Sequence, residues 1–539
     1  MAVELSKSLQ QNVRLACALF CIILLPVTSI NVFASVPRPS PTPQTDARSV
    51  IKQAKKFAKR GEFDEAEKAY TTAVKLRPND IELKLALAKI YLKQKKLSDA
   101  YDIAFSIAKA DSSNAEAYAI VGAALLGSGD FKESRPIILT AIKLNRREAL
   151  AWASLGLLEF YENNVSESLT ALREAVYRDD SEPDYIFALA QVAARSENFK
   201  EAADAYHRFL RISPNTDKER RDRIIGIINF LEYVQQKPTL YSIGGEERTT
   251  VPIKLINDRP IVKVQINGKE ELQNFVLDTG SGISVISEET AKRLDIDPIT
   301  KGGVGSGIGG DGKFDIVFGF VREIKIGDVS IRNIPVYIRK FHTKSESIDG
   351  YIGLSLISKF LTTIDYGAKT FELERSNTSA NISEQENVAE KAEKGVTLPL
   401  RLTSSGYLSG EVLLAEHSVP FNFIVDTGAT ITVISKEIME KEKFRSLEQI
   451  GVTNVFGSAG VTYGVVLFVV PELKFGSNVQ NDVSAIALDL AIINQSSGYV
   501  QSGILGGNFL SKYRLTFDFQ RSKVKFIPIS ATAETIIPK

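Results

Sequence analysis

The chain has 539 residues, of which 44% are hydrophobic and 24% are charged. This ordinary globular composition excludes a wholly disordered chain, a collagen and a multi-pass membrane protein. Lysine and arginine number 66 against 65 aspartates and glutamates, so a net charge of +1 gives no general attraction to nucleic acid or anionic lipid. At about 150 residues per domain, three or four domains are expected.

Residues 1–34 have the layout of a signal peptide, because Lys7 and Arg14 precede an apolar run that ends in small residues. The alternative is an uncleaved anchor, since 15–34 could just cross a bilayer. A proline-rich linker follows at 35–47. We therefore expect the rest of the chain to work outside the cytoplasm, either periplasmic or secreted, or anchored to the membrane by this segment.

Cysteine and histidine are scarce. Both cysteines, Cys17 and Cys21, lie in the N-terminal segment, and the three histidines are scattered. A chain that has lost this segment has no thiol, which excludes disulfide scaffolds, cysteine nucleophiles, iron–sulfur clusters and zinc–thiolate sites. We expect no metal and no cofactor, and a chemistry that depends on carboxylates, hydroxyls and the backbone.

Residues 48–236 contain a 34-residue period. Small residues recur at this interval in two series that are twelve residues apart: Ala54, Ala88, Gly122, Gly156 and Ala190, and then Ala66, Ala100, Ser134, Ser168 and Ala202. Small side chains at such positions let two helices approach closely. The pattern resembles the tetratricopeptide repeat family, whose units are helix–turn–helix.

The resemblance covers about five repeats and is followed by a capping helix at about 217–236. It implies a surface on which a protein partner or a substrate docks, and the alternative is a spacer. We expect the basic run from Lys218 to Arg223 in the capping helix to be a solvated face.

After the helical region, short apolar strands punctuated by glycine predict an all-β region. This region is duplicated at an offset near 148. The first copy occupies 245–375, the second occupies 396–532, and a polar linker at 376–395 joins them.

Each copy carries an Asp-Thr-Gly sequence between two apolar strands, at Asp278 in the first copy and at Asp426 in the second. A single Asp-Thr-Gly is weak evidence, since most occurrences are turns. Two Asp-Thr-Gly sequences at equivalent positions of a duplicated region are much stronger evidence for a functional site. The apolar strand delivers the aspartate into a site, the glycine permits a tight turn beneath it, and the threonine hydroxyl can tie one loop to its twin.

The two copies resemble the retroviral-protease-like (retropepsin) lobe of the aspartic proteases, here duplicated within one chain. The resemblance implies that Asp278 and Asp426 are catalytic. It implies a supporting role in the catalytic loops for Thr279, Gly280, Ser281, Thr427, Gly428 and Ala429. Mobile flaps that close over substrate are implied at Gly305, Gly307, Ile308 and Gly309, and at Gly457 and Gly460. A structural motif that packs against the catalytic loops is implied at Ile352 and Gly353, and at Leu505 and Gly506.

The expected fold is therefore a multidomain one, with an all-α tetratricopeptide solenoid followed by an all-β, acid-protease-like region of two lobes. The expected function is that of an exported aspartic endopeptidase. Its two aspartates share a proton and activate a water molecule on a peptide substrate, as in other aspartic proteases, and no covalent intermediate forms.

We expect the two lobes to pair within one chain, and a swapped dimer is the alternative. The alternative function is a non-catalytic extracytoplasmic scaffold, which binds peptides or partners through the repeats and a protease-like clamp. No nucleic-acid partner is expected.

Overall fold

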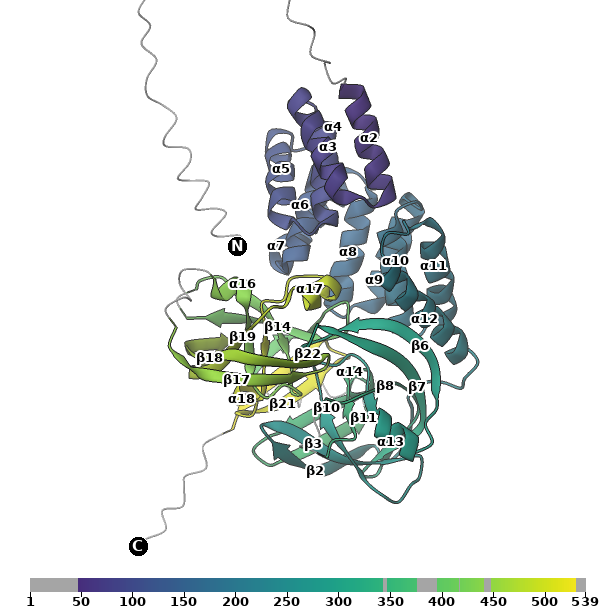
Figure 1. The fold of residues 1–539 in the computed structure, drawn as a ribbon, viewed down its shortest axis with the longest axis vertical. Coiled ribbons are helices and arrows are strands. Elements are labelled where there is room, and N and C mark those ends of the chain that lie inside the picture. The colour runs from purple at the N-terminus through teal and green to yellow at the C-terminus, as the bar shows by residue number, and fades with distance from the viewer. Residues whose placement is uncertain (1–46, 343–346, 376–394, 416, 441–446, 530–539) are drawn as a thin grey trace, which may run out of the picture.

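The computed structural model describes residues 47–342, 347–375, 395–415, 417–440 and 447–529. A solenoid of antiparallel helices precedes two β-rich lobes, which confirms the predicted fold class (Figure 1). The predicted signal segment, nearly all of the proline-rich linker and nearly all of the linker between the lobes lie outside the described residues. Across the described ranges, no helix combines the length and the apolar character that a membrane span requires.

Within residues 47–234, ten helices form five antiparallel pairs and an eleventh closes the stack. The helices are α2 (Ala47–Arg60), α3 (Phe63–Leu76), α4 (Ile81–Lys93), α5 (Leu97–Ala110), α6 (Ala115–Ser128), α7 (Phe131–Leu144), α8 (Ala149–Tyr161), α9 (Val165–Arg178), α10 (Pro183–Arg195), α11 (Phe199–Ile212) and α12 (Lys218–Val234).

The small residues of the 34-residue period lie where the two helices of a pair meet. A Cβ atom added to Gly122 would lie 2.6 Å from Ile138 Cγ1, and one added to Gly156 would lie 2.6 Å from Leu172 Cγ. The hydroxyls of Ser134 and Ser168 donate to the carbonyl oxygens of these two glycines. A larger side chain at either glycine would push the pair apart, which is why the period is one of small residues.

The turn inside each helix pair contains one residue with a left-handed backbone, again at intervals of 34. These residues are Gly61, Lys95, Gly129, Asn163 and Glu197, with φ between 59° and 83°. Four of these turns contact the β-rich lobes: Lys95 Nζ donates to Asn494 O (2.6 Å), Gly129 O accepts from Asn422 Nδ2 (3.5 Å), Asn163 Nδ2 donates to Phe519 O (2.8 Å), and Glu197 pairs with Lys359 Nζ (2.7 Å). One edge of the solenoid therefore docks on the lobes, turn by turn.

The first lobe consists of β1 (Ser242–Gly245), β2 (Arg248–Ile256), β3 (Arg259–Ile266), β4 (Gln273–Leu277), β5 (Val285–Ser287), α13 (Glu288–Arg293), β6 (Pro298–Ser306), β7 (Lys313–Ile326), β8 (Val329–Arg339), β9 (Gly350–Ile352), α14 (Leu354–Ile357), β10 (Phe360–Asp365) and β11 (Thr370–Arg375). Because β1 pairs with β8, the sheet of this lobe begins at Ser242.

The second lobe repeats most of this order and adds one helix, Ala491–Ser497. Its elements are β12 (Val396–Pro399), β13 (Arg401–Leu402), β14 (Leu408–Leu414), β15 (Phe421–Val425), β16 (Thr432–Ser435), α16 (Lys436–Met439), β17 (Gln449–Gly457), β18 (Gly460–Phe475), β19 (Asn478–Leu488), α17 (Ala491–Ser497), β20 (Gly503–Leu505), α18 (Gly507–Leu510), β21 (Tyr513–Asp518) and β22 (Lys523–Pro528).

A shared antiparallel sheet joins the two lobes. Its strand order is β12-β22-β21-β10-β11-β2, so β10 of the first lobe pairs directly with β21 of the second. The hydroxyls of Thr363 and Thr516 face each other across this junction at 3.0 Å. One hydrophobic core, which includes Phe371 and Phe517, continues beneath the sheet from one lobe into the other. The two lobes thus assemble within a single chain.

The solenoid is packed against both lobes by aromatic side chains. Phe131 and Tyr161 surround Tyr499 of the second lobe, with ring centroids 4.9 and 5.0 Å from that of the tyrosine. On the first lobe, Phe230 of α12 stacks on Phe318 of β7 at 4.3 Å. Stacked and edge-to-face rings of this kind stabilise an interface beyond the area they bury.

The helix α12 and the strand β6 lie side by side, with backbone close to backbone (Figure 1). A Cβ atom on Gly226 would lie 2.4 Å from Gly302 Cα, and one on Gly303 would lie 2.8 Å from Arg223 Cα. Gly302 and Gly303, which precede the predicted flap residues on β6, therefore serve the close approach of a helix. The capping helix holds the base of this hairpin.

We predict that Gly226→Ala lowers the apparent melting temperature, although alanine is the better helix former by about 1 kcal/mol. The added methyl group would overlap backbone atoms of β6, which cannot rotate away, and overpacking of this kind costs about 1–3 kcal/mol. Thermal unfolding of the full chain measures the effect. The control is Ile225→Ala at the exposed neighbouring position, where a change within about 0.5 kcal/mol is expected. A stabilised Gly226→Ala variant would contradict the packing.

Candidate active site

Two equivalent strands, β4 and β15, end at the two aspartates. Each strand lies parallel to a short partner, β9 or β20, and the ladder continues one residue beyond it. Asp278 N donates to Ile352 O and Asp426 N donates to Leu505 O, both at 3.0 Å. Because the strands are buried, each aspartate is carried into the interior between the lobes.

Gly353 and Gly506 of the predicted structural motif lie against the loops that carry the two aspartates. A Cβ atom on Gly353 would lie 2.7 Å from Ser281 O, and one on Gly506 would lie 2.5 Å from the carbonyl carbon of Ile431. The chain also closes on itself here, since Leu354 N donates to Ser281 O at 2.8 Å. No side chain fits between these segments, so both positions require glycine.

The two loops are tied together by their threonines, which are fully buried. Thr279 Oγ1 donates to Val425 O and Thr427 Oγ1 donates to Leu277 O, both at 2.7 Å. Each hydroxyl also accepts from the backbone N–H of the other threonine, at 3.1 and 3.2 Å. The four hydrogen bonds fix the lobes relative to each other at the point where the aspartates meet.

The two carboxyl groups lie beside each other, since a Cβ atom on Gly428 would lie 2.7 Å from Asp278 Cγ and 3.1 Å from Asp426 Oδ1. Each accepts from the backbone of its own loop: Asp278 Oδ1 from Gly280 N at 2.9 Å, and Asp426 Oδ1 from Gly428 N at 2.8 Å. Each is also covered by the opposite loop, because a Cβ atom on Gly280 would lie 2.3 Å from Asp426 Cγ. Glycine at this position is what lets the loops cross so closely.

Burial raises the pKa of both carboxyl groups. The pKa of Asp278 is raised well above its usual range by burial first and then by the like charge of Asp426. Hydrogen bonds from the backbone act in the opposite direction at Asp426. Two like charges this close cannot both form cheaply, so ionisation of one carboxyl group opposes ionisation of the other, and the titration belongs to the pair.

The predicted flap residues lie at the tips of two hairpins that meet above the aspartates. Gly305 lies near the end of β6, and Gly307, Ile308 and Gly309 lie in the turn between β6 and β7. In the second hairpin, Gly457 and Gly460 flank the turn between β17 and β18. Ala459 N donates to Ile308 O at 2.8 Å, so one tip is hydrogen-bonded to the other. The first connection spans six residues and the second spans two, which makes the hairpins unequal.

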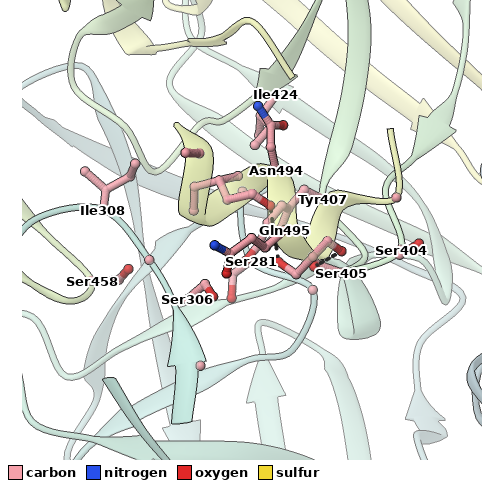
Figure 2. Close-up of a pocket in the computed structure, with 18 of the residues that line it drawn as sticks. Ser281, Ser306, Ile308, Ser404, Ser405, Tyr407, Ile424, Ser458, Asn494 and Gln495 are labelled. Carbon is pink, nitrogen blue, oxygen red and sulfur yellow. Dashed lines mark hydrogen bonds between the residues drawn. The ribbon is translucent and has the colours of Figure 1, made fainter. Parts of the chain in front are cut away.

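A cleft of about 1750 Å³ extends from the aspartates along the solenoid. Figure 2 shows Ile308 and Ser458 of the hairpin tips to one side of Ser281, with Ser404 and Ser405 to the other. The solenoid supplies one wall of this cleft through residues of α8, α10 and α12. A peptide that reaches the aspartates would therefore run along the helices.

The basic run of α12 is only partly a solvated face: Lys218 is exposed as predicted, but the prediction was wrong for Arg220 and Arg223. Both side chains are half-buried and line the cleft. Arg220 lies over the rings of Phe187 and Phe209, at 4.3 and 4.8 Å from their centroids. The sequence shows only a charged helix, and its inward face is set by the docking of the solenoid on the lobes.

The inner face of the solenoid is bridged by ion pairs. Lys93 Nζ of α4 contacts Glu182 Oε1 at 2.5 Å and Asp184 Oδ2 at 2.7 Å, near the start of α10. These two carboxylates raise the pKa of Lys93 against the effect of its burial. The repeats thus offer a continuation of the cleft rather than a separate open groove.

Within the described ranges, no three histidine, cysteine, aspartate or glutamate side chains gather in a way that would hold a metal ion.

Comparison with known families assigns both parts of the chain. A family model described as aspartyl protease matches residues 262–356 and 411–509, one match in each lobe. Models of the tetratricopeptide repeat match residues 57–124, 122–183 and 155–216. A comparison with curated protein sequences finds no match.

Among solved structures, the chain is similar to a tetratricopeptide repeat protein of Thermus thermophilus, with 20% identity and a TM-score of 0.30 over 34% of this chain and 98% of that one. It is also similar to an aspartic proteinase of Irpex lacteus, with 15% identity and a TM-score of 0.36 over 53% of this chain and 99% of that one. A third similar structure is PilF of Pseudomonas aeruginosa, with 17% identity and a TM-score of 0.27 over 35% of this chain and 84% of that one.

We predict that Asp278→Asn stabilises the fold relative to the unchanged chain at neutral pH. The unfolded aspartate ionises near pH 4, whereas the folded pKa is raised, so ionisation increasingly favours the unfolded state as the pH rises above about 4. Each unit of difference between the two pKa values corresponds to about 1.4 kcal/mol. Asparagine does not ionise and escapes this loss.

Urea unfolding of both proteins between pH 3 and 8 measures this difference in stability. It is expected to grow as the pH rises and to shrink below about pH 4. The control Asp482→Asn changes an exposed aspartate outside the cleft, in a left-handed conformation that suits asparagine. A difference between Asp278→Asn and the unchanged chain that does not depend on pH would contradict the raised pKa.

Proposed function

We propose that this chain, in which tetratricopeptide repeats precede two tandem aspartyl-protease domains of the retropepsin-like type, is an aspartic endopeptidase. The observation that carries the proposal is the pair of buried carboxyl groups, Asp278 and Asp426, held beside each other by their loops. Burial of two acids together is costly, and a scaffold has no use for it.

In the proposed mechanism, a water molecule is bound between the two carboxyl groups. The ionised member accepts a proton from this water as its oxygen attacks the peptide carbonyl carbon, and the protonated member donates to the carbonyl oxygen. A proton then passes to the peptide nitrogen and the carbon–nitrogen bond breaks. The backbone N–H groups of Gly280 and Gly428 stabilise the carboxylate form throughout.

The hairpin tips supply the cover of the site. Ile308 belongs to an apolar cluster on the wall of the second lobe, and the tips bond to each other above the aspartates. Exclusion of water by such a cover strengthens the electrostatic interactions inside the cleft. Substrate entry requires that the hydrogen bond from Ala459 N to Ile308 O breaks.

We propose that the repeats guide an extended substrate segment into the cleft. The support is the continuity of the cleft with the inner face of the solenoid, along α8, α10 and α12. A docked solenoid that shares a wall with the site orients the substrate before the bond to be cleaved reaches the aspartates.

We expect Asp278→Asn and Asp426→Asn each to lower peptide cleavage by roughly 10²–10⁴-fold, the contribution of positioned acid–base groups. The measurement is hydrolysis of a fluorogenic peptide library by the purified chain between pH 4 and 7, a window within which we expect the pair to pass through its singly protonated state. The control Asp482→Asn is expected to retain full activity. Retention of full activity by either dyad variant would overturn a single composite site. Binding of peptides without cleavage by the unchanged chain would favour the non-catalytic scaffold.

We also propose that the chain acts outside the cytoplasm. The support is the signal-peptide layout of residues 1–34. N-terminal sequencing of the protein recovered from expressing cells is expected to give a start close to residue 35, in an extracytoplasmic fraction. A start at Met1 in the membrane fraction would favour the anchored alternative, and a start at Met1 in the cytoplasmic fraction would contradict export.

A further inference from the structure

The two lobes place different side chains at one equivalent position beside the aspartates. Arg339 is the last residue of β8 and pairs with Ser287 of β5 in a parallel ladder. Leu488 is the last residue of β19 and pairs with Ser435 of β16 in the same way. Because the lobes are duplicates, these two residues are related by the pseudo-symmetry of the site. At this equivalent position, the first lobe therefore carries a cation that lines the cleft, whereas the second lobe carries a buried leucine.

Arg339 is poorly neutralised in this position. Its guanidinium lies over the ring of Phe314, 3.6 Å from the centroid, and Nη2 donates to Ser458 O at the tip of the second hairpin. Its Nε is buried and has no hydrogen-bond partner among the described residues. Of the groups whose charge acts on it, Asp278 is the carboxyl group, and the others are tyrosines. A buried donor left without an acceptor is costly, so a ligand that supplies the acceptor gains affinity.

The remaining wall residues follow the same contrast. In the second lobe, Val433, Ile486 and Ile504 line the cleft and belong to one apolar cluster with Leu488. In the first lobe, the positions that pair in the same way as Ile486 and Ile504 are Tyr337 and Tyr351, which also line the cleft. At these two paired positions the first lobe therefore offers aromatic side chains beside the Arg339 cation, and the second lobe offers aliphatic ones.

An acidic side chain near the aspartates would meet the negative charge of the pair. It is accepted only where a cation offsets that repulsion, and the planar guanidinium suits a carboxylate better than any other side chain. We propose that Arg339 makes the first-lobe wall a subsite for an aspartate or glutamate side chain, while the second-lobe wall takes an aliphatic side chain. On this view, which rests on the proposed function, the preferred peptide bond joins an acidic residue to an aliphatic one.

The experiment uses decapeptides, acetylated and amidated at their ends, with Glu-Leu or Leu-Glu at the centre, and matched peptides with Gln in place of Glu. Binding is measured by fluorescence anisotropy on the full chain with Asp426→Asn, so that no peptide is cleaved. The better Glu peptide is expected to bind roughly tenfold more tightly than its Gln partner, as for one hydrogen bond to a charged group.

Arg339→Met, added to the same chain, is expected to bring this ratio close to one, and Arg339→Lys is expected to keep part of it. The control Arg332→Met changes an arginine on the same strand that pairs with Glu323 outside the cleft, and it is expected to keep the full ratio. If Arg339 only holds Ser458 in place, Arg339→Met weakens both peptides equally, and the inference is overturned. Equal binding of Glu and Gln peptides also overturns it.

Further outcomes separate this inference from the proposed function. Peptides that bind with the expected preference but resist the unchanged chain leave the subsite standing and refute the endopeptidase. Peptides that are cleaved without any preference refute the subsite alone, and a failure of all four to bind contradicts both. If a Gln peptide with a free C-terminal carboxylate binds as tightly as the Glu peptide, Arg339 binds the C-terminus of a peptide. This result would overturn the side-chain subsite.

Discussion

The structure depends on the mutual burial of two acids. A carboxyl group between two lobes is tolerated only when its neighbours supply hydrogen bonds and when a second carboxyl group can share its proton. The loop glycines permit the close crossing, and the backbone N–H groups face the carboxyl oxygens. The threonine hydroxyls of Thr279 and Thr427 cross from lobe to lobe, so the geometry of the acids is set by backbone atoms of both halves.

The same constraint explains why the lobes are so firmly joined. The sheet pairing of β10 with β21 and the common core beneath it fix the halves far from the acids, and the threonines fix them beside the acids. The solenoid then adds a third rigid body, because α12 rests on the base of one hairpin and α8 rests on the other lobe. The cleft is consequently built from three parts of one chain.

The main elements could be predicted because they are periodic. A 34-residue repeat of small residues defines helix pairs wherever it occurs, and a duplication with two equal Asp-Thr-Gly loops defines a paired site. The walls of the cleft could not be predicted in the same way. Arg223 lies about 80 residues from the glycines of β6 that it approaches, and only the docked structure shows that it faces inward. The contrast between Arg339 and Leu488 is present in the sequence, but it becomes meaningful only once the ladder registers align the two strands.

Solenoid proteins ordinarily gain and lose units with little penalty, because each unit touches only its neighbours. Here four successive turns, at Lys95, Gly129, Asn163 and Glu197, each meet a different place on the β-rich lobes. Insertion or deletion of one 34-residue unit would move every later turn away from the residues that it contacts on the lobes, and it would separate α12 from β6. The docking on the β-rich lobes therefore constrains the number of repeats. We expect the repeats to evolve by substitution within units rather than by duplication of units.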